Sequence, residues 1–431
     1  MKTVLLLITF ALTGLSSLAQ PYVSGGNTRH RFAQMYMGLN AQLVPSGGQF
    51  VYRGSDGQQL TGTVPTQLRP HLTIGALHFW GHADFYVTFP VGGNLIRRPD
   101  GEPTASYDPG IETGARMYPW RLEAGKVRPF VGVAFTTSSF RQLVAGQQPD
   151  APSLNRSLFP LQAGLTFATK HSLLEAGVAY RTRSSFNYYI DRSTVVTMAV
   201  PSTWFWLGIK WYFDTTLPAE KDYANTQRLE QRLIRHNQLS GLALAIGPSS
   251  AFFTRKSVYN SETCPYLQPY GVNVFPEFGI GYYDQPHEIH FNLAYRQNSS
   301  DKNGFGLSQQ LHRRSLALEA YRFLGDYHGF VPFIGPSLSL EYLTVDETDQ
   351  PAQTNTSRTH TTLKPGITFG WDIRPTKLES IVLRTNLRYI PNLNVTMPNG
   401  KSVAFDQLEF NFIQAVWYPG LRKRVSREQQ E

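Results

Sequence analysis

The stretch that most constrains the fold is Trp204–Phe213, which reads Trp-Phe-Trp-Leu-Gly-Ile-Lys-Trp-Tyr-Phe. With the two-residue period of a β-strand, one face is apolar, and the other face carries Gly208 and Lys210. The apolar face comprises Phe205, Leu207, Ile209, Trp211 and Phe213. A transmembrane β-strand needs about 9–11 residues, with apolar side chains toward lipid and aromatic residues at the interfaces. The stretch therefore predicts a strand of a membrane β-barrel.

Seven earlier segments show the same alternation of apolar and polar residues. They are 35–40, 72–76, 83–89, 111–117, 127–135, 161–167 and 175–181. With Trp204–Phe213 they make eight strands, the smallest common membrane barrel. Their connections alternate between short turns and long polar loops. The short ones are 80–82, 119–126 and 170–172, and the long ones are 45–70, 90–108, 137–157 and 184–202. Short periplasmic turns and long outer loops are typical of such barrels.

The scheme stops at 214–240 and then starts again. A thin apolar stripe among charged residues over 219–239 predicts a helical periplasmic linker; a plug or a docking helix for a periplasmic partner is the alternative. Eight further strands follow at 242–246, 274–282, 289–295, 315–324, 330–342, 363–373, 381–389 and 408–418. Long polar loops are predicted near 249–270, 297–306, 343–360 and 391–405.

Landmark residues of the first half recur in the second half. The strand Arg-Pro-Phe-Val-Gly at 128–132 resembles Val-Pro-Phe-Ile-Gly at 331–335, and Trp211-Tyr212 resembles Trp417-Tyr418. A spacing that stays near 205 residues indicates an internal duplication. The polar residues 420–431 after the second copy are predicted to be a disordered tail.

The first nineteen residues predict a secretory signal peptide. Lys2 precedes the apolar run Val4–Leu12, and Ala19-Gln20 supplies the cleavage site. No later segment approaches 18 consecutive apolar residues, so no spanning helix is predicted. The net charge is +9, but only Arg422–Arg424 is a basic cluster, so nucleic acid is not an expected partner. Cys264 is the only cysteine, which excludes an internal disulfide.

The signal peptide ending in Ala19-Gln20, the strand Arg128–Val133 and the aromatic strand Trp204–Phe213 resemble the outer-membrane β-barrel proteins of Bacteroidota. Their relatives are eight-stranded OmpA/OmpX-like barrels, including PorT-like members. The resemblance covers nearly the whole mature chain, taken twice. It implies outer-membrane lipid and the barrel-assembly machinery as partners. Such barrels often end on an aromatic residue, whereas here Trp417-Tyr418 is followed by a tail.

Charged residues on inward faces are the candidate functional residues, because a charge at membrane depth must be paired or hydrated. They are Glu112, Arg116, Glu175, Arg181, Lys210, Glu277, Glu288, Arg296, Glu319, Arg384 and Arg388. Aromatic residues of the two closing strands are Trp204, Trp211, Phe213, Trp417 and Tyr418. The charges predict either a polar pore or a salt-bridged plug, and eight strands leave room only for side chains or a small ligand.

No catalytic, cofactor or metal motif is recognised, and no cofactor is expected. His287-Glu288-Ile289-His290 lies near a turn and lacks the helix of a zinc His-Glu-x-x-His motif. His78 and His82 flank another turn, and His360 lies on an outer loop without an acid partner. We therefore do not expect an enzyme, with a lipid-modifying activity as the minor alternative.

These observations predict an all-β protein with a transmembrane antiparallel up-and-down barrel of 2 × 8 strands. The expected parts are a signal peptide (1–19), a first barrel (20–213), a linker (214–240), a second barrel (241–419) and a tail (420–431). Two closed barrels favour a structural, adhesion or assembly role. The alternative is one sixteen-stranded barrel, which would leave an aqueous channel for small solutes.

Overall fold

A computed structural model describes residues 33–53, 58–96, 104–143, 154–212, 223–267, 270–327, 329–374 and 376–428. The predicted signal peptide, Phe213 and the first part of the predicted linker (214–222) lie outside the described residues.

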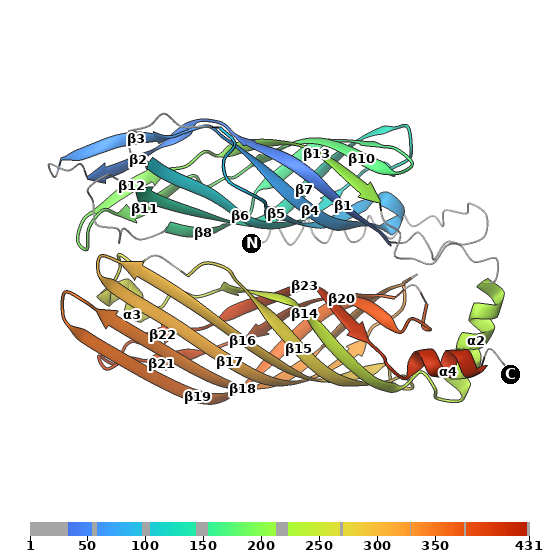
Figure 1. Cartoon of the computed structure of the whole chain (residues 1–431). Helices are drawn as coiled ribbons and strands as arrows, with labels where there is room; N and C mark the ends of the chain where they lie inside the picture. The colour runs from blue at the N-terminus through green and yellow to red at the C-terminus, as the bar shows by residue number, and fades with distance from the viewer. Residues whose placement is uncertain are drawn as a thin grey trace.

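The first half of the chain closes into an antiparallel barrel of eight strands (Figure 1). In chain order the wall strands are β1 (Ala33–Val44), β4 (Gln67–His78), β5 (Ala83–Pro90), β6 (Thr104–Met117), β7 (Val127–Leu143), β9 (Leu161–Ala168), β10 (Ser172–Tyr180) and β13 (Thr203–Tyr212). Each strand pairs with the next, and β13 pairs with β1 from Tyr36↔Tyr212 to Leu43↔Phe205, which closes the ring.

The second half closes in the same way. Its wall strands are β14 (Gly241–Phe253), β15 (Asn273–Asp284), β16 (Ile289–Gly304), β17 (Leu307–Phe323), β18 (Phe330–Asp349), β19 (Thr354–Ile373), β20 (Ile381–Ile390) and β23 (Gln407–Trp417). The closing pair is β14 with β23.

Two barrels, rather than one, are therefore the architecture. The strand Thr203–Tyr212 pairs with the first strand of its own half and not with β14. The predicted 2 × 8 antiparallel fold is confirmed, and the alternative of one sixteen-stranded barrel is wrong. The physical reason lies in the inward side chains, which meet across a narrow lumen: Lys210 on β13 lies 3.2 Å from Asp84 on β5, although these strands are not neighbours.

An apolar band surrounds the wall of each barrel. On β16 the outward residues are Ile289, Phe291, Leu293 and Tyr295, after which Gln297, Ser299 and Asp301 face outward. The outward faces of β18 and β19 also change from apolar to polar toward the same end of the barrel. On β18 the change lies between Leu340 and Thr344, and on the antiparallel β19 it lies between Leu363 and Thr361. The ring of apolar side chains with aromatic borders is what a lipid bilayer requires of a β-barrel.

The wall strands continue beyond this band on one side, which we call the hairpin end. The long loops predicted near 297–306 and 343–360 are instead strand pairs, and β16 joins β17 through the tight turn Phe305-Gly306, with positive φ at both residues. The prediction missed these extensions because their outward faces become polar above the band, although Leu311 and Val345 are still buried on the inward face. Shorter elements also lie at this end: β2 (Gly47–Arg53), β3 (Gln59–Val64), β8 (Leu154–Leu158), β11 (Ser185–Tyr189), β12 (Val195–Ala199), α3 (Val258–Thr263), β21 (Asn394–Thr396) and β22 (Ser402–Ala404).

The opposite side, the short-turn end, carries the turn η2 (Phe79–Gly81) and two helices, α2 (Tyr223–Arg235) and α4 (Leu421–Glu428). Figure 1 shows both helices at this end of the second barrel. The prediction of a disordered tail is wrong for Leu421–Glu428, because Leu421 and Val425 form an apolar stripe that packs against the barrel. Within the described residues, no helix is long and apolar enough to cross a membrane.

The two barrels lie side by side (Figure 1). Aromatic rings from their outer walls meet, with ring centroids 4.2 Å apart for Phe135 and Phe252 and 6.1 Å apart for Phe85 and Trp371. At the hairpin end, Arg192 of the β11–β12 turn reaches Asp349 of β18.

Candidate functional site

A layer of buried ions fills the first barrel. Lys210 on β13 lies with its Nζ 2.7 Å from Glu175 of β10 and 3.2 Å from Asp84 of β5. Arg116 on β6 lies 2.8 Å from Glu175 and 3.4 Å from Asp84. Tyr36 donates a hydrogen bond to Asp84. Two cations thus meet two carboxylates across the lumen, and all four side chains are at most 3% exposed.

Aromatic side chains and one more carboxylate complete this layer. The Arg116 guanidinium lies 4.1 Å from the ring centroid of Tyr86 and 5.2 Å from that of Trp206. Glu112 accepts hydrogen bonds from the Tyr86 hydroxyl at 2.7 Å and from the Gln162 amide at 2.9 Å. A cavity of about 20 Å³ remains beside these groups, which leaves room for about one water molecule.

Two inward glycines make room for large rings at equivalent places in the two barrels. A Cβ on Gly164 would lie 2.6 Å from the Phe130 ring, and a Cβ on Gly370 would lie 2.6 Å from the Phe333 ring. Small and large residues on neighbouring strands therefore fill the narrow interior together, as in other small barrels.

The second barrel contains a larger ion network. Arg296 lies 3.0 Å from Glu319 and 2.6 Å from Glu409, and Arg313 bridges Glu409 at 2.5 Å to Glu341 at 2.7 Å. Arg388 donates to Glu277 at 2.6 Å and lies 2.8 Å from Glu319. The members are Arg296, Arg313, Arg388, Glu277, Glu319, Glu341 and Glu409. These side chains come from six strands, so the network crosses the lumen.

A second pair lies nearer the short-turn end of the same barrel. Arg384 donates to Asp372 at 2.6 and 2.9 Å and also contacts the hydroxyl of Tyr321. The Tyr321 ring stacks on Phe333, with centroids 4.4 Å apart, and on His290, with centroids 5.1 Å apart.

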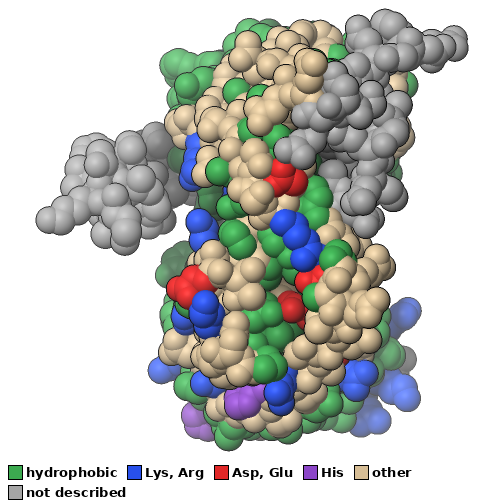
Figure 2. All heavy atoms as spheres, turned by 90° about the vertical axis from the view of Figure 1, so that its left-hand side faces the viewer, with side chains coloured by type: hydrophobic (Ala, Val, Ile, Leu, Met, Phe, Trp, Pro, Cys, Tyr) green, Lys and Arg blue, Asp and Glu red, His purple; other side chains and the backbone are tan. Residues whose placement is uncertain are grey.

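Both mouths of the second barrel are covered by apolar side chains. At the short-turn end, Leu229 and Leu233 of α2 and Leu421 of α4 join an apolar cluster that includes Tyr283 and Tyr418 of the barrel. At the hairpin end, a second apolar cluster combines the α3 region with the β21–β22 loop. Figure 2 looks onto the hairpin end and shows hydrophobic side chains gathered over the lower, second barrel, with lysine and arginine side chains spread around them.

Most of the predicted interior charges lie inside a barrel. Arg181 is buried with its guanidinium 5.0 Å from the Trp204 ring centroid. Glu288 is the exception and corrects the prediction: it lies in the turn before β16, one-third exposed, bonded to Tyr283 and Lys377. The physical reason is that Glu288 belongs to the turn Gln285–Glu288, and β16 begins only at Ile289.

The closing strands place their aromatic residues on opposite faces. Trp211 and Trp417 face outward and are each 47% exposed, whereas Trp204 and Tyr418 are buried. Outward rings at a strand end are typical of the membrane interface.

Sequence reasoning did not include Asp84, Tyr36 and Arg313 among the interior groups. Asp84 and Tyr36 occupy inward positions in strands with a clear two-residue alternation. The same alternation would therefore have predicted both as interior residues. Arg313 lies before the predicted start of its strand at 315, whereas β17 begins at Leu307.

The described histidines form no metal centre. Among the described residues, no group of three or more histidine, cysteine, aspartate and glutamate side chains could hold a metal ion. His287 contacts Asp284 at 2.6 Å in an exposed turn, His290 is buried against Tyr321, and His82 contacts the Tyr118 carbonyl at 3.1 Å. His360 lies exposed on β19.

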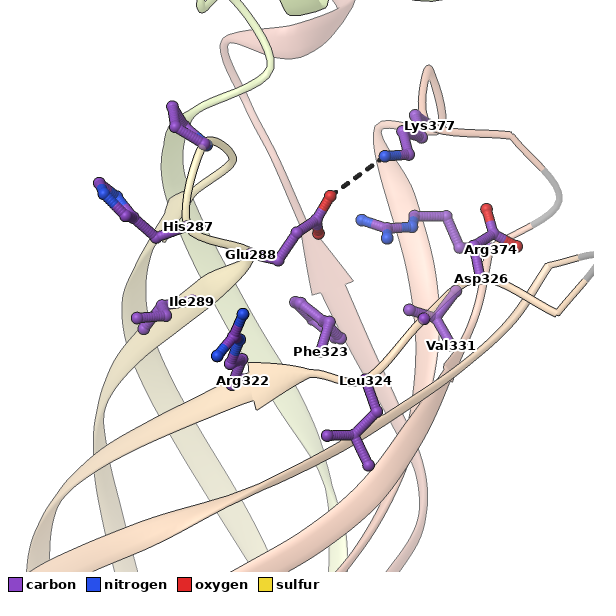
Figure 3. A pocket seen from close by; sticks show the side chains of 12 residues that line it. His287, Glu288, Ile289, Arg322, Phe323, Leu324, Asp326, Val331, Arg374 and Lys377 are labelled. Carbon is purple, nitrogen blue, oxygen red and sulfur yellow. Dashed lines mark hydrogen bonds and ion pairs between the residues drawn. The ribbon is translucent and has the colours of Figure 1, made fainter.

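A pocket of about 460 Å³ opens at the short-turn end of the second barrel (Figure 3). Its charged lining comprises His287, Glu288, Arg322, Asp326, Arg374 and Lys377. Glu288 lies 3.1 Å from Lys377, and Figure 3 shows Arg374 in the same mouth, above Phe323. Volumes of about 300–1,000 Å³ are typical of small-ligand sites.

Comparison with known proteins gives distant structural likenesses. No protein-family model and no curated protein matches the sequence. Among solved structures, the chain is similar to Neisserial surface protein A, with 15% identity over 42% of this chain and 96% of that one and a TM-score of 0.27. It is similar to OprG of Pseudomonas aeruginosa (14% identity, 43% and 98% of the chains, TM-score 0.30) and to OmpT of Vibrio cholerae (10%, 90% and 98%, TM-score 0.17). The fold assignment rests on the strand pairing described above.

A charged clasp joins the barrels at the hairpin end. Arg192 donates two hydrogen bonds to Asp349, at 2.8 and 3.1 Å, and two to the Phe305 carbonyl, at 2.8 and 3.0 Å. The hydrogen bond from Arg192 lowers the pKa of the Asp349 carboxyl. Beside it, burial acts to raise the pKa of Asp191, but hydrogen bonds from Ser193 and Thr194 bring that pKa to about 2.

Proposed function

We propose that this chain is an integral outer-membrane protein of two closed, non-conducting barrels, with a structural, adhesion or assembly role and no catalytic activity. The single observation that carries the proposal is the filling of both lumens by paired charges and rings. A buried ion network that spans a lumen blocks the path that a solute would need.

The sidedness of the proposal follows from the ends of the barrels. Short turns, α2 and α4 are assigned to the periplasm, and the long hairpins to the outside. The hairpin end is then the surface available for adhesion. Outer-membrane lipid and the barrel-assembly machinery are the proposed partners, and nucleic acid is not one. Because α2 covers the second barrel, we propose that the linker seals this mouth, and only its exposed polar face remains for a periplasmic partner.

Conductance in planar bilayers tests the proposal. Properly folded protein, identified by a heat-modifiable band on gels, is expected to give silent bilayers. Steady single-channel steps from folded protein would overturn it. A variant that opens the first lumen, Arg116→Ala with Trp206→Ala, serves as a comparison, because it removes the guanidinium and the ring that lie together at its centre.

The porin alternative depended on a single sixteen-stranded barrel. It loses that basis because each half of the chain closes into its own eight-stranded barrel. A lipid-modifying activity is the remaining alternative. It predicts altered lipid A or phospholipid by mass spectrometry when the gene is expressed, with the change abolished by a rim substitution such as His287→Ala. Unchanged lipid profiles are expected.

We also propose that the two barrels arose by duplication of one unit of the Bacteroidota OmpA/OmpX-like type, exported by a cleaved signal peptide at 1–19. Matching landmarks support the duplication. Pro129 and Pro332 both lie on the fifth wall strand, and Trp211 and Trp417 both lie on the eighth. The Phe130–Gly164 contact of the first barrel also has its counterpart in Phe333–Gly370.

A further inference from the structure

Two of the three lysine and arginine side chains in the pocket of Figure 3 have no carboxylate partner among the described residues. Within the part of the chain that the structure describes, neither Arg322 nor Arg374 forms an ion pair, and the Nε of Arg374 is buried without a hydrogen-bond partner. The third cation, Lys377, already neutralises Glu288 at 3.1 Å. Asp326 is held by the Gly329 amide, which donates to it at 2.8 Å. Three cations therefore face two carboxylates that have partners.

Arg374 is pre-positioned for an anion. Its guanidinium is held between the rings of Phe323, at 5.3 Å, and Tyr283, at 5.7 Å. The Lys377 ammonium is held by Glu288 at 3.1 Å, and the backbone amide of Lys377 donates to Glu230 of α2 at 2.8 Å. Planar guanidinium groups bind phosphate oxygens in pairs, and an ammonium group adds a point charge. Since both groups are already ordered, binding an anion requires little further loss of side-chain freedom.

The location favours a lipid as the source of that anion. The pocket wall includes Ile289 and Leu324, which lie on the outward face at the edge of the apolar band. Leu324 is 55% exposed, and Figure 3 shows it pointing away from the charged groups. A molecule with a phosphate and an acyl chain can place the phosphate among the cations and the chain along the apolar outer wall.

The helices beside the pocket add positive charge. Among the described side chains of α2 and α4, every exposed charged group is a cation, whereas Glu230 and Glu428 are buried. The exposed cations are Arg228, Arg232, Arg235, Arg422, Lys423 and Arg427. Basic side chains beside a membrane attract anionic lipid headgroups.

We propose that this pocket is a binding site for the phosphate headgroup of an anionic phospholipid of the adjoining leaflet. The inference rests on the membrane location in the proposed function. It assigns the site to Arg322, Arg374 and Lys377, with the neighbouring helices raising the local concentration of anionic lipid. Phosphatidylglycerol is the probe chosen, because its headgroup carries a phosphate without a compensating cation.

Native mass spectrometry of the detergent-solubilised full chain tests the site. Separate titrations use phosphatidylglycerol, zwitterionic phosphatidylcholine and inorganic phosphate. We expect the wild type to retain one phosphatidylglycerol molecule and to bind phosphatidylcholine at least tenfold more weakly. The double variant Arg322→Gln/Lys377→Gln is expected to bind phosphatidylglycerol at least tenfold more weakly than the wild type does. Lys401→Gln is the matched control, since Lys401 also pairs with a glutamate, Glu262 at 2.9 Å, but at the hairpin end. It is expected to bind like the wild type.

Three results would overturn the proposal: no retained lipid on the wild type, equal retention by the double variant, or competition by inorganic phosphate as strong as by the lipid itself. The last result would assign the pocket to free phosphate. Arg322 and Lys377 are not core residues, and heat-modifiable migration shows whether each variant is folded. If the folded protein gives no conductance and retains no lipid, this lipid site is rejected and the proposed function stands. If the folded protein conducts, only the proposed function is rejected.

Discussion

The ion layer of the first barrel makes a quantitative prediction for Lys210→Met. Within the wild-type layer, the cluster of Lys210, Arg116, Asp84 and Glu175 is neutral, whereas the neighbouring Glu112 is bonded to Tyr86 and Gln162. Methionine has a similar length but no charge, so the variant keeps two buried carboxylates with one cation. Removing one partner of a buried ion pair costs about 3–5 kcal/mol, because the remaining charge has no compensation. That free energy lowers the folding equilibrium constant by roughly a hundredfold to several thousandfold, at about 1.4 kcal/mol per factor of ten.

Urea unfolding in phospholipid vesicles, followed by tryptophan fluorescence, measures this loss. The signal reports mainly on the first barrel, because all of the 7 tryptophans except Trp371 and Trp417 lie in the first half. Lys126→Met is the matched control in the same barrel. Its ion pair with Glu123 is exposed, with side chains 56% and 41% accessible, so no change in the unfolding midpoint is expected.

A second substitution distinguishes charge from packing. In Lys210→Met/Asp84→Asn this ion cluster is neutral again, since Glu175 keeps its ion pair with Arg116 at 2.8 Å. We expect this double variant to regain more than half of the lost free energy of unfolding. A single variant that loses less than about 1 kcal/mol, the range of exposed pairs, would refute the reasoning. So would a double variant no more stable than the single one.

Three further predictions follow from other parts of the molecule. Gly164→Ala should cost about 1–3 kcal/mol in the same unfolding assay, because its Cβ would lie 2.6 Å from the Phe130 ring; an unchanged midpoint would contradict the close packing. The folded-state pKa of Asp349 is lowered, so its stabilising contact with Arg192 is complete above the unfolded pKa of about 4 and is lost as pH falls through the folded pKa. The protection of amides in the β11–β12 turn against hydrogen exchange, relative to their intrinsic exchange rates, should therefore fall only in acid, and Asp349→Asn should remove that pH dependence. Cys264 is buried and its thiol pKa is raised to about 12 by burial, so maleimide should label it only after unfolding; rapid labelling of the folded protein would place it at the surface.

The two-residue period predicted the walls of both barrels because lipid and lumen lie on opposite sides of every strand. Trp204–Phe213 shows why this worked: Leu207 is 68% exposed on the outer face, whereas Trp206 beside it is buried. Above the apolar band the outward face becomes polar, as at Gln297 and Ser299, and the inward face mixes polar side chains with apolar ones such as Leu311, so the regular contrast is lost. The strand extensions of β16 to β19 therefore looked like loops.

The helices at the short-turn end show a different limit. The stripe Leu229–Leu233 was sufficient to predict a helix, but not what it covers, because its partner is a set of rings from distant strands. For the tail, the composition of 420–431 suggested disorder. Leu421 and Val425 stabilise the helix because they pack against the mouth of the second barrel. From the sequence alone, two apolar residues do not reveal that packing partner.

The choice between one barrel and two depends on contacts that no strand alone can reveal. Lys210 on β13 lies 3.2 Å from Asp84 on β5, and Arg313 on β17 lies 2.5 Å from Glu409 on β23; neither pair belongs to adjacent strands. Contacts across a lumen at this distance exist only where eight strands bring opposite walls together. In a sixteen-stranded ring the same side chains would be separated by water, and the rings stacked on them would lose their packing. Each half therefore carries the inward residues needed to fill a narrow barrel, and this is the physical reason that Thr203–Tyr212 returns to its own first strand.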